Sequence, residues 1–307
     1  MTGIDKYEIT GGASCSIAAG WGCNLVSWQV GGNELMYCPP EFPAQATKIT
    51  GGGSPLLFPA IGRTWDMSAT PPVSGSYRIA GSDKTYFMPS HGIIYLSKFV
   101  KVEEEACGDS ASVLYRLDIP AKVREENYPF HVEFSQRFTL RGASIELETT
   151  MSNKDSKPAP MAFGHHPYFR VSNPAREGVE VILPVTKRLM LDPETVLFTG
   201  ESEPADGLLK LQAGVYYDHV FAGLTGSRMS LVDKQARRTT HVDFDESFEL
   251  MTVYAPDGSE FVCIEPWTRG LGAFGEISKP GWESGEIVPV LQPGETKVLR
   301  TVYGVEL

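Results

Sequence analysis

Short runs in which apolar and polar residues alternate recur from one end of this chain to the other, and they limit its fold more than any other feature. The clearest runs cover residues 113–119, 145–149 and 248–254. Successive side chains of a β-strand point to opposite faces, so alternation with a period of two predicts half-buried strands. Turn-forming residues separate the runs, and the Asp-Gly pair within residues 254–261 predicts a hairpin.

Helical periodicity is nearly absent from the sequence. Residues 192–197 and 233–238 are the pieces that suggest helix, and neither could exceed one or two turns. Parallel α/β folds need strands that alternate with helices, so we predict an all-β protein, a large antiparallel β-sandwich with few short helices. An all-β domain can reach 307 residues, and no linker, repeat or change of composition divides the chain. We therefore expect residues 1–307 to form a single domain.

The acidic balance of the chain restricts its partners. A formal net charge of -11 argues against a nucleic-acid or anionic-membrane surface, because both need basic patches. There is no run of roughly 18 apolar residues that could span a bilayer, and the first ten residues lack the basic and apolar regions of a signal peptide. The five cysteines, Cys15, Cys23, Cys38, Cys107 and Cys263, follow no metal-binding spacing. We expect reduced thiols in a cytoplasmic protein with a small, neutral ligand.

Two adjacent histidines lie in the first stretch that suggests chemistry, residues 161–171 (MAFGHHPYFRV). On an extended strand His166 and Tyr168 share one face, and His165 and Phe169 lie on the other. The proline after the histidines predicts an edge, a bulge or the end of a strand. An imidazole beside an aromatic ring can exchange a proton near neutral pH. For a histidine considered alone, however, a structural role is the more frequent interpretation.

The second informative stretch is the apolar run at residues 261–267 (FVCIEPW). It is typical of a strand covered on both faces, and Glu265 ends it. Partial burial would raise the pKa of this carboxyl and make it a better base, whereas a strand end in solvent would leave it an ordinary surface group. Trp267, and Trp65 from an upstream loop, could stack on the apolar face of a sugar or belong to the core.

Three more residues are candidate ligand contacts. Arg63 lies within residues 36–90 and His91 directly follows them, each beside a glycine, and we expect this Pro- and Gly-rich region to form loops over one end of the sandwich. Asp218 lies in the alternating run at residues 217–221, and it could accept hydrogen bonds from a hydroxylated ligand or sit in a turn. A loop arginine considered alone is more often simply solvated.

Motifs of other enzyme classes are absent or lack their context. Residues 270–275 match G-x-G-x-x-G, but Pro280-Gly281 follows too soon for the helix that a dinucleotide site needs. Neither the phosphate-binding G-x-x-x-x-G-K-[ST] motif nor the esterase motif G-x-S-x-G occurs. No H-x-H or H-x-x-x-H spacing occurs, and His165 and His166 should diverge, so no metal site is expected.

In their order along the chain, these tracts resemble the aldose 1-epimerase (galactose mutarotase) family. The matching tracts are residues 51–59, Gly62-Arg63, His91-Gly92, residues 153–169, Asp218-His-Val-Phe221, Cys263-Ile-Glu265 and the Leu-Gln-Pro-Gly-Glu turn at residues 291–295. Each motif is modest, but their order is specific. The resemblance implies a galactose mutarotase-like β-sandwich with a sugar cleft and no cofactor.

The resemblance also implies a reaction, the interconversion of the α and β anomers of a free aldose. Glu265 would be the base that takes the C1 hydroxyl proton, and His166 would be the acid that protonates the ring oxygen. Arg63, His91 and Asp218 would hold sugar hydroxyls and position the ring. The implied partner is a small-molecule sugar, bound by a monomer or a homodimer.

Departures from the family pattern leave the sugar open, among them Pro266-Trp267 after Glu265 in place of Thr-Gln. Glucose, galactose and a hexose phosphate are the candidates, so a hexose-6-phosphate mutarotase is one alternative. A second alternative is a non-catalytic carbohydrate-binding protein that uses the same cleft. A third is a glycoside hydrolase with Asp218 and Glu265 as its two carboxylates.

Overall fold

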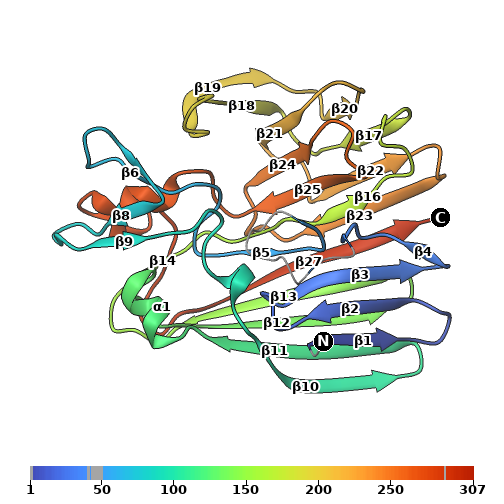
Figure 1. Ribbon diagram of the computed structural model, residues 1–307, viewed down its shortest axis with the longest axis horizontal. Helices are drawn as coiled ribbons and strands as arrows, with labels where there is room; N and C mark the ends of the chain where they lie inside the picture. Colours follow the sequence, from blue (N-terminus) through green and yellow to red (C-terminus); the bar gives the residue numbers. More distant parts are fainter. Residues whose placement is uncertain (1–2, 40–41, 43–50, 287) are drawn as a thin grey trace.

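Antiparallel sheets dominate the regular secondary structure of the computed structural model, which describes residues 3–39, 42, 51–286 and 288–307 (Figure 1). Residues 40–41 and 43–50 of the expected loop region therefore lie outside the described residues. The largest sheet has nine strands, in the order β10 (Val100–Cys107), β11 (Ser110–Asp118), β12 (Val132–Arg141), β13 (Ser144–Asn153), β27 (Thr296–Glu306), β23 (Arg238–Phe244), β22 (Arg228–Asp233), β17 (Val179–Ile182) and β20 (Leu208–Lys210). A four-stranded sheet comprises β1 (Ile4–Glu8), β2 (Ser14–Ala18), β3 (Asn24–Val30) and β4 (Asn33–Glu34).

The eight-stranded sheet carries the residues of chemical interest. Its order is β19 (Phe198–Pro204), β18 (Lys187–Leu191), β21 (Tyr217–Ala222), β24 (Leu250–Ala255), β25 (Phe261–Trp267), β15 (Gly164–His165) and β5 (Leu56–Leu57), and β16 (Tyr168–Arg170) also pairs with β25. Three short pairs complete the strands: β6 (Trp65–Asp66) with β7 (Val73–Ser74), β8 (Ser76–Arg78) with β9 (Thr85–Phe87), and β14 (Ala159–Pro160) with β26 (Val290–Leu291). The predicted hairpin at residues 254–261 is confirmed, because it joins the antiparallel pair β24 and β25.

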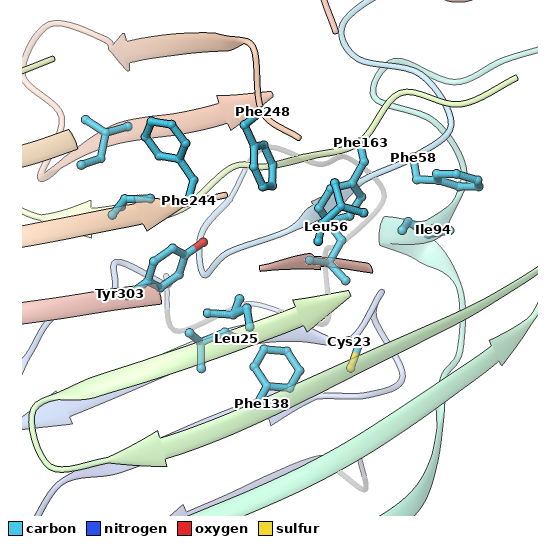
Figure 2. Packing of buried hydrophobic residues seen from close by; sticks show 14 of the residues in the cluster. Cys23, Leu25, Leu56, Phe58, Ile94, Phe138, Phe163, Phe244, Phe248 and Tyr303 are labelled. Atoms are coloured by element: carbon cyan, nitrogen blue, oxygen red, sulfur yellow. The ribbon is translucent and has the colours of Figure 1, made fainter. Parts of the chain in front are cut away.

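The main hydrophobic core lies between these sheets. Buried side chains from several strands meet there, including Leu25 of β3, Phe138 of β12, Tyr303 of β27 and Phe244 of β23 (Figure 2). Ile264 of β25 belongs to the same cluster, so the eight-stranded sheet turns one of its faces toward this core.

The prediction of half-buried strands is confirmed for two of the three clearest runs. Strands β11 and β13 bury every second residue. For residues 248–254 the prediction is wrong, because β24 is buried on both faces. Met251 and Val253 belong to the main core, whereas Leu250 belongs to a second, smaller apolar cluster. The reason is position: β24 lies between β21 and β25, and both faces of this central strand are covered.

Helices are few and short in the described chain, as predicted, but they lie elsewhere than expected. They are the α-helix α1 (Ala121–Glu126) and the 3-10 helices η1 (Ile94–Leu96), η2 (Ala273–Ser278) and η3 (Trp282–Ser284). The two expected pieces form turns, because aspartates bind the local backbone instead. Asp192 Oδ1 accepts hydrogen bonds from the N–H groups of Glu194 and Thr195, and Asp233 Oδ1 accepts one from Ala236. Within the described residues, no helix has the length and apolar character needed to cross a membrane.

Candidate active site

The five residues predicted to bind or transform a ligand line one cavity of about 270 Å³. Arg63 and His91 come from loops, His166 from the junction of β15 and β16, Asp218 from β21 and Glu265 from β25. The other lining residues are Gly62, Ser90, Val196, Tyr216, Thr252, Tyr254, Trp267 and Leu271. Folding thus brings residues from separate segments of the chain into a single concave site.

Strand register explains why these side chains meet. Asp218 lies opposite Tyr254, and Thr252 lies opposite Glu265, so the members of each pair share a face of the sheet. Intervening residues such as Ile264 point to the main core. One face of the eight-stranded sheet is therefore core, and the other is the floor of the cavity.

Glu265 is buried in this floor, with 1% of its surface exposed. The indole N–H of Trp267 donates a 3.1 Å hydrogen bond to Glu265 Oε2, and Oε1 lies 3.4 Å from His166 Nε2. Burial, reinforced by the negative charge of Asp218, raises the pKa of this carboxyl well above 4.5, and the Trp267 hydrogen bond opposes the rise. The alternative of a strand-end carboxylate in solvent is wrong, because β25 continues past Glu265 to a buried Trp267.

The ring of His166 faces the same cavity. It stacks on Tyr168 with a centroid distance of 4.7 Å and an interplanar angle of 11°, and it meets the ring of His91 edge-on at 5.7 Å. Burial, followed by the electrostatic interaction with His91, lowers the pKa of this imidazole well below 6.5. The proline after the histidines separates β15 from β16, so the predicted break in the strand is confirmed.

Burial favours the neutral forms of both Glu265 and His166. It raises the pKa of the carboxyl from 4.5 and lowers that of the imidazole from 6.5. In an acid–base pair, one group donates a proton to a bound molecule while the other accepts one. The pair is therefore suited to give a proton at one atom of a ligand while taking one from another.

His165 points away from the cavity into the core, with 1% of its surface exposed. Its ring packs edge-on against Phe163 at 5.0 Å and Tyr303 at 6.2 Å, and it is tilted against Phe248 at 6.2 Å. Burial lowers the pKa of His165 to about 3, so the ring is neutral at physiological pH. The predicted divergence of the two histidines is confirmed.

Hydrogen bonds hold the loops of Arg63 and His91 to each other. The backbone N–H of His91 donates to the carbonyl of Gly62 at 2.8 Å, and the N–H of Gly62 donates to His91 Nδ1 at 3.3 Å. Burial lowers the pKa of His91 to about 4, so the neutral ring carries its proton on Nε2 and can donate it to a hydroxyl. Gly92 has a φ of 85°, and a Cβ there would lie 2.0 Å from the carbonyl oxygen of Phe58, so the turn beside His91 requires glycine.

Arg63 and Asp218 bring opposite charges to the cavity. Arg63 is exposed to solvent, and Asp218 is partly buried. Burial raises the pKa of Asp218, and a hydrogen bond with Tyr216 opposes the rise. The alternative that Asp218 sits in a turn is wrong, because it lies within β21.

Sequence reasoning missed part of the cavity wall. Thr252 and Tyr254 line the cavity from β24, and the buried Thr252 hydroxyl has no hydrogen-bond partner among the described residues. The signal was present in the alternation of residues 248–254, which places both side chains on one face of a strand. The sequence did not reveal that this strand pairs directly with the strand of Glu265.

The two tryptophans considered as sugar platforms occupy different places. Trp267 lines the cavity and is 3% exposed. Trp65 is not among the described residues that line it, and its indole N–H donates to the carbonyl of Thr195 at 3.1 Å. Of the two, Trp267 is the one placed to act on a ligand or on a neighbour in this cavity.

One group of potential metal ligands lies at the cavity floor. Donor atoms of His166, Cys263 and Glu265 lie within 4.8 Å of one another. Cys263 and Glu265 lie two residues apart on β25, whereas His166 comes from a distant segment, so no spacing in the sequence reveals the group of three. Burial raises the pKa of the Cys263 thiol well above 9.0, which disfavours the thiolate that binds zinc. The absence of a metal cofactor stays a prediction.

Comparison with known proteins gives a consistent picture. A family model described as aldose 1-epimerase matches residues 5–304. The protein LacX, chromosomal, of Lactococcus lactis subsp. lactis is 26% identical over 268 residues, which cover 81% of each chain. The match therefore extends over nearly all of the sequence that forms the sheets and the cavity.

Several solved structures share the architecture. The Slr1438 protein from Synechocystis sp. PCC 6803 has a TM-score of 0.81 and 23% identity, over 100% of this chain and 98% of that chain. A galactose mutarotase-like protein from Clostridium acetobutylicum has a TM-score of 0.80 and 19% identity, over 99% and 98%. Another from Lactobacillus casei ATCC 334 has a TM-score of 0.76 and 20% identity, over 99% and 100%. The predicted all-β, galactose mutarotase-like β-sandwich is confirmed.

Proposed function

The chain belongs to the aldose 1-epimerase family, and from this premise we propose that it is a mutarotase that interconverts the α and β anomers of a free aldohexose. The observation that carries the proposal is the buried pair of Glu265 and His166, 3.4 Å apart at the floor of one cavity. Anomer exchange needs one general base and one general acid near the C1–O5 bond of the sugar. These two residues supply both.

The proposed reaction begins when Glu265 removes the proton of the C1 hydroxyl. The C1–O5 bond breaks, its electron pair goes to O5, and O5 takes the proton of His166. The open-chain aldehyde then rotates about C1–C2, which presents the other face of the carbonyl. On reclosure O5 adds to C1 and returns its proton to His166, and the C1 oxygen takes its proton back from Glu265. Both groups regain their starting state, so the cycle requires no cofactor.

The cycle starts with the single proton of the pair on His166. At a separation of 3.4 Å, the attraction between carboxylate and imidazolium is about 5 kcal/mol for an effective dielectric constant of 20. Burial opposes this attraction, because removing two charges from water costs several kcal/mol. Attraction favours the ionised pair and burial favours the neutral pair, and a proton that passes between the two groups converts one form into the other. Each group can therefore serve as acid in one direction and as base in the other.

The other three predicted residues are assigned to binding. The neutral ring of His91 and the guanidinium of Arg63 would donate hydrogen bonds to sugar oxygens, and Asp218 would accept them from hydroxyls. Because Arg63 and His91 lie on loops that are hydrogen-bonded to each other, they would position the ring as a unit against the sheet.

The charges of the cavity favour a neutral sugar. Two carboxyl groups, those of Asp218 and Glu265, line it, and Arg63 is the one lysine or arginine among the described lining residues. Phosphate recognition relies on charge-assisted hydrogen bonds from basic groups. A hexose-6-phosphate mutarotase remains the alternative, and a substrate panel separates the two.

Polarimetry and proton NMR of freshly dissolved α-glucose, α-galactose and α-glucose 6-phosphate test the proposal. We expect the protein to accelerate anomer exchange of a free aldose, and we expect the His166→Asn variant to lose most of this acceleration. Absence of acceleration across a wider panel of free and phosphorylated aldoses would refute it. Sugar binding without exchange would instead support a carbohydrate-binding protein, and release of sugar from glycosides would support a hydrolase.

A further inference from the structure

Trp267 is the immediate partner of the proposed base. It lies two residues after Glu265 on the same face of β25, and its indole N–H donates the 3.1 Å hydrogen bond to Glu265 Oε2. Both groups are buried, so water does not compete for this bond. A donor to an ionised acceptor in such a setting forms one of the stronger hydrogen bonds in a protein.

The indole ring is fixed from several sides. Trp267 pairs with Leu250 of β24 and with Gly164 of β15, and it belongs to the second apolar cluster with Leu57 and Ala162. A Cβ at Gly164 would lie 2.6 Å from Cδ1 of the indole and 3.3 Å from its Nε1. The missing side chain at Gly164 therefore leaves the space in which the ring lies. The N–H group cannot follow a movement of the carboxylate without disturbing this packing.

This arrangement distinguishes the two oxygens of Glu265. Oε2 is engaged by Trp267, and Oε1 is the oxygen directed at His166 Nε2. A carboxylate otherwise turns readily about its last bond, because that torsion is broad. A fixed donor on one oxygen therefore sets the direction of the other, which is the oxygen that would take the proton of the C1 hydroxyl.

Given the proposed mutarotase function, we propose that Trp267 is a positioning residue, whose indole N–H holds the Glu265 carboxylate with Oε1 aimed at the reacting atoms. Its contribution is made through Glu265 and differs from that of an aromatic platform, which would act on the sugar. The two roles predict different kinetic effects when the residue is substituted. Loss of a platform weakens binding of substrate, whereas loss of positioning lowers the rate of the chemical step.

The Trp267→Phe variant separates these roles, because it keeps an aromatic ring and removes the N–H. We expect kcat to fall roughly 10- to 100-fold, the range for loss of a hydrogen bond to a charged group. We expect KM to stay within about threefold, because the interaction is not made with the substrate. The pH–rate profile should move to higher pH, because the Trp267 hydrogen bond lowers the pKa of the carboxyl and its removal raises that pKa.

Trp282 provides the matched control. It is 2% exposed, lies in η3 outside the cavity wall, and its indole N–H has no hydrogen-bond partner among the described residues. Trp282→Phe makes the same chemical change in a buried site, and we expect kcat and the pH profile to be unchanged. Gly164→Ala is the second test, because it keeps the N–H but displaces the ring. We expect it to lower kcat at unchanged KM, and thermal denaturation would verify that each variant is folded.

The outcomes that overturn the inference are specific. An unchanged kcat and pH profile in Trp267→Phe would make the residue a packing residue, and a raised KM at unchanged kcat would make it a platform. Equal losses in Trp267→Phe and Trp282→Phe would indicate general destabilisation. If the wild-type protein exchanges no anomers, the proposed function fails. In that case 13C NMR of the Glu265 carboxyl still tests the contact between Trp267 and Glu265, because it needs no activity. A carboxyl pKa raised in Trp267→Phe but not in Trp282→Phe would support the inference, and equal values would refute it.

Discussion

The same substitution at two adjacent histidines tests the division between packing and chemistry. We consider His165→Asn and His166→Asn, which remove neighbouring imidazoles from opposite sides of the chain. His166 faces the cavity, whereas His165 packs among the core rings of Phe163, Phe248 and Tyr303. We expect His166→Asn to lose activity and largely keep its stability, and we expect His165→Asn to do the reverse.

For His166→Asn, the amide cannot act as the acid for the ring oxygen. General acid–base catalysis contributes about 10²- to 10⁴-fold, so kcat should fall by that factor, which is roughly 3 to 5 kcal/mol in the activation barrier. The free energy of unfolding should fall less than in His165→Asn, because one side of the His166 ring borders the cavity, whereas His165 is packed among core rings.

For His165→Asn, the lost ring contacts should cost roughly 1–3 kcal/mol of stability at neutral pH. A second effect depends on pH. The pKa of His165 is about 3 in the folded protein and 6.5 in the unfolded chain, so the unfolded chain binds more protons between these values and wild-type stability falls as pH falls through this range. Between pH 6.5 and pH 5, at about 1.4 kcal/mol per pH unit, the loss is roughly 2 kcal/mol. The Asn variant lacks this contribution.

Urea denaturation at pH 7.5 and pH 5, with anomer exchange measured at pH 7.5, gives both quantities. His91 and His166 also have lowered pKa values, so the contribution of His165 is the difference in pH dependence between wild type and variant. His131→Asn is the control, because its side chain is 41% exposed and lies outside the cavity. The reasoning is refuted if His165→Asn keeps its stability but loses activity as His166→Asn does, or if its stability falls with acid as steeply as that of wild type.

Three other predictions follow from the pair and its neighbours. Glu265→Gln should lower kcat by about 10²- to 10⁴-fold in the polarimetric assay. Because the pKa of Glu265 is raised on folding, this carboxyl costs wild type stability as pH rises above 4.5. Thermal denaturation should therefore show that the stability of the Gln variant relative to wild type increases with pH. In a profile of kcat/KM against pH, activity should fall at acid pH where the pair of Glu265 and His166 gains a second proton. This fall should occur below pH 6.5, because burial lowers the pKa of His166. A fall centred above pH 6.5 would contradict this account. Asp218→Asn should raise KM about tenfold or more through a lost sugar contact; it should also move the pH profile to lower pH, opposite to Trp267→Phe, because the charge of Asp218 raises the pKa of Glu265.

The sequence carried most of the information about faces of strands. Alternation identified β11 and β13, and the spacing of His165, His166 and Tyr168 assigned the two histidines to opposite faces. These inferences succeed because the side-chain period of a strand is fixed by its backbone. The burial of Glu265 was one of two open alternatives, and the structure decides it.

What the sequence could not supply was the identity of neighbours across strands. The contact between Thr252 and the strand of Glu265 depends on the pairing of β24 with β25, and the second buried face of β24 depends on the sheet around it. The turn at Asp192 was expected as a helix, because its periodicity did not reveal that the aspartate side chain binds the local backbone. Tertiary context outweighs local propensity in each case.

Strand register also connects the stability of the fold with the position of the proposed base. Val262 and Ile264 lie in the main core, and Glu265 lies between them and the end of the same strand, facing the cavity. A shift of one residue in the pairing of β25 would turn Ile264 into the cavity and bury Glu265 in the apolar core without His166 or Trp267. An unpaired buried carboxyl is costly, and so is an exposed isoleucine, so both faces of the strand favour the same register. The core residues that stabilise the sheet therefore also fix the direction of the carboxyl to which His166 and Trp267 are matched.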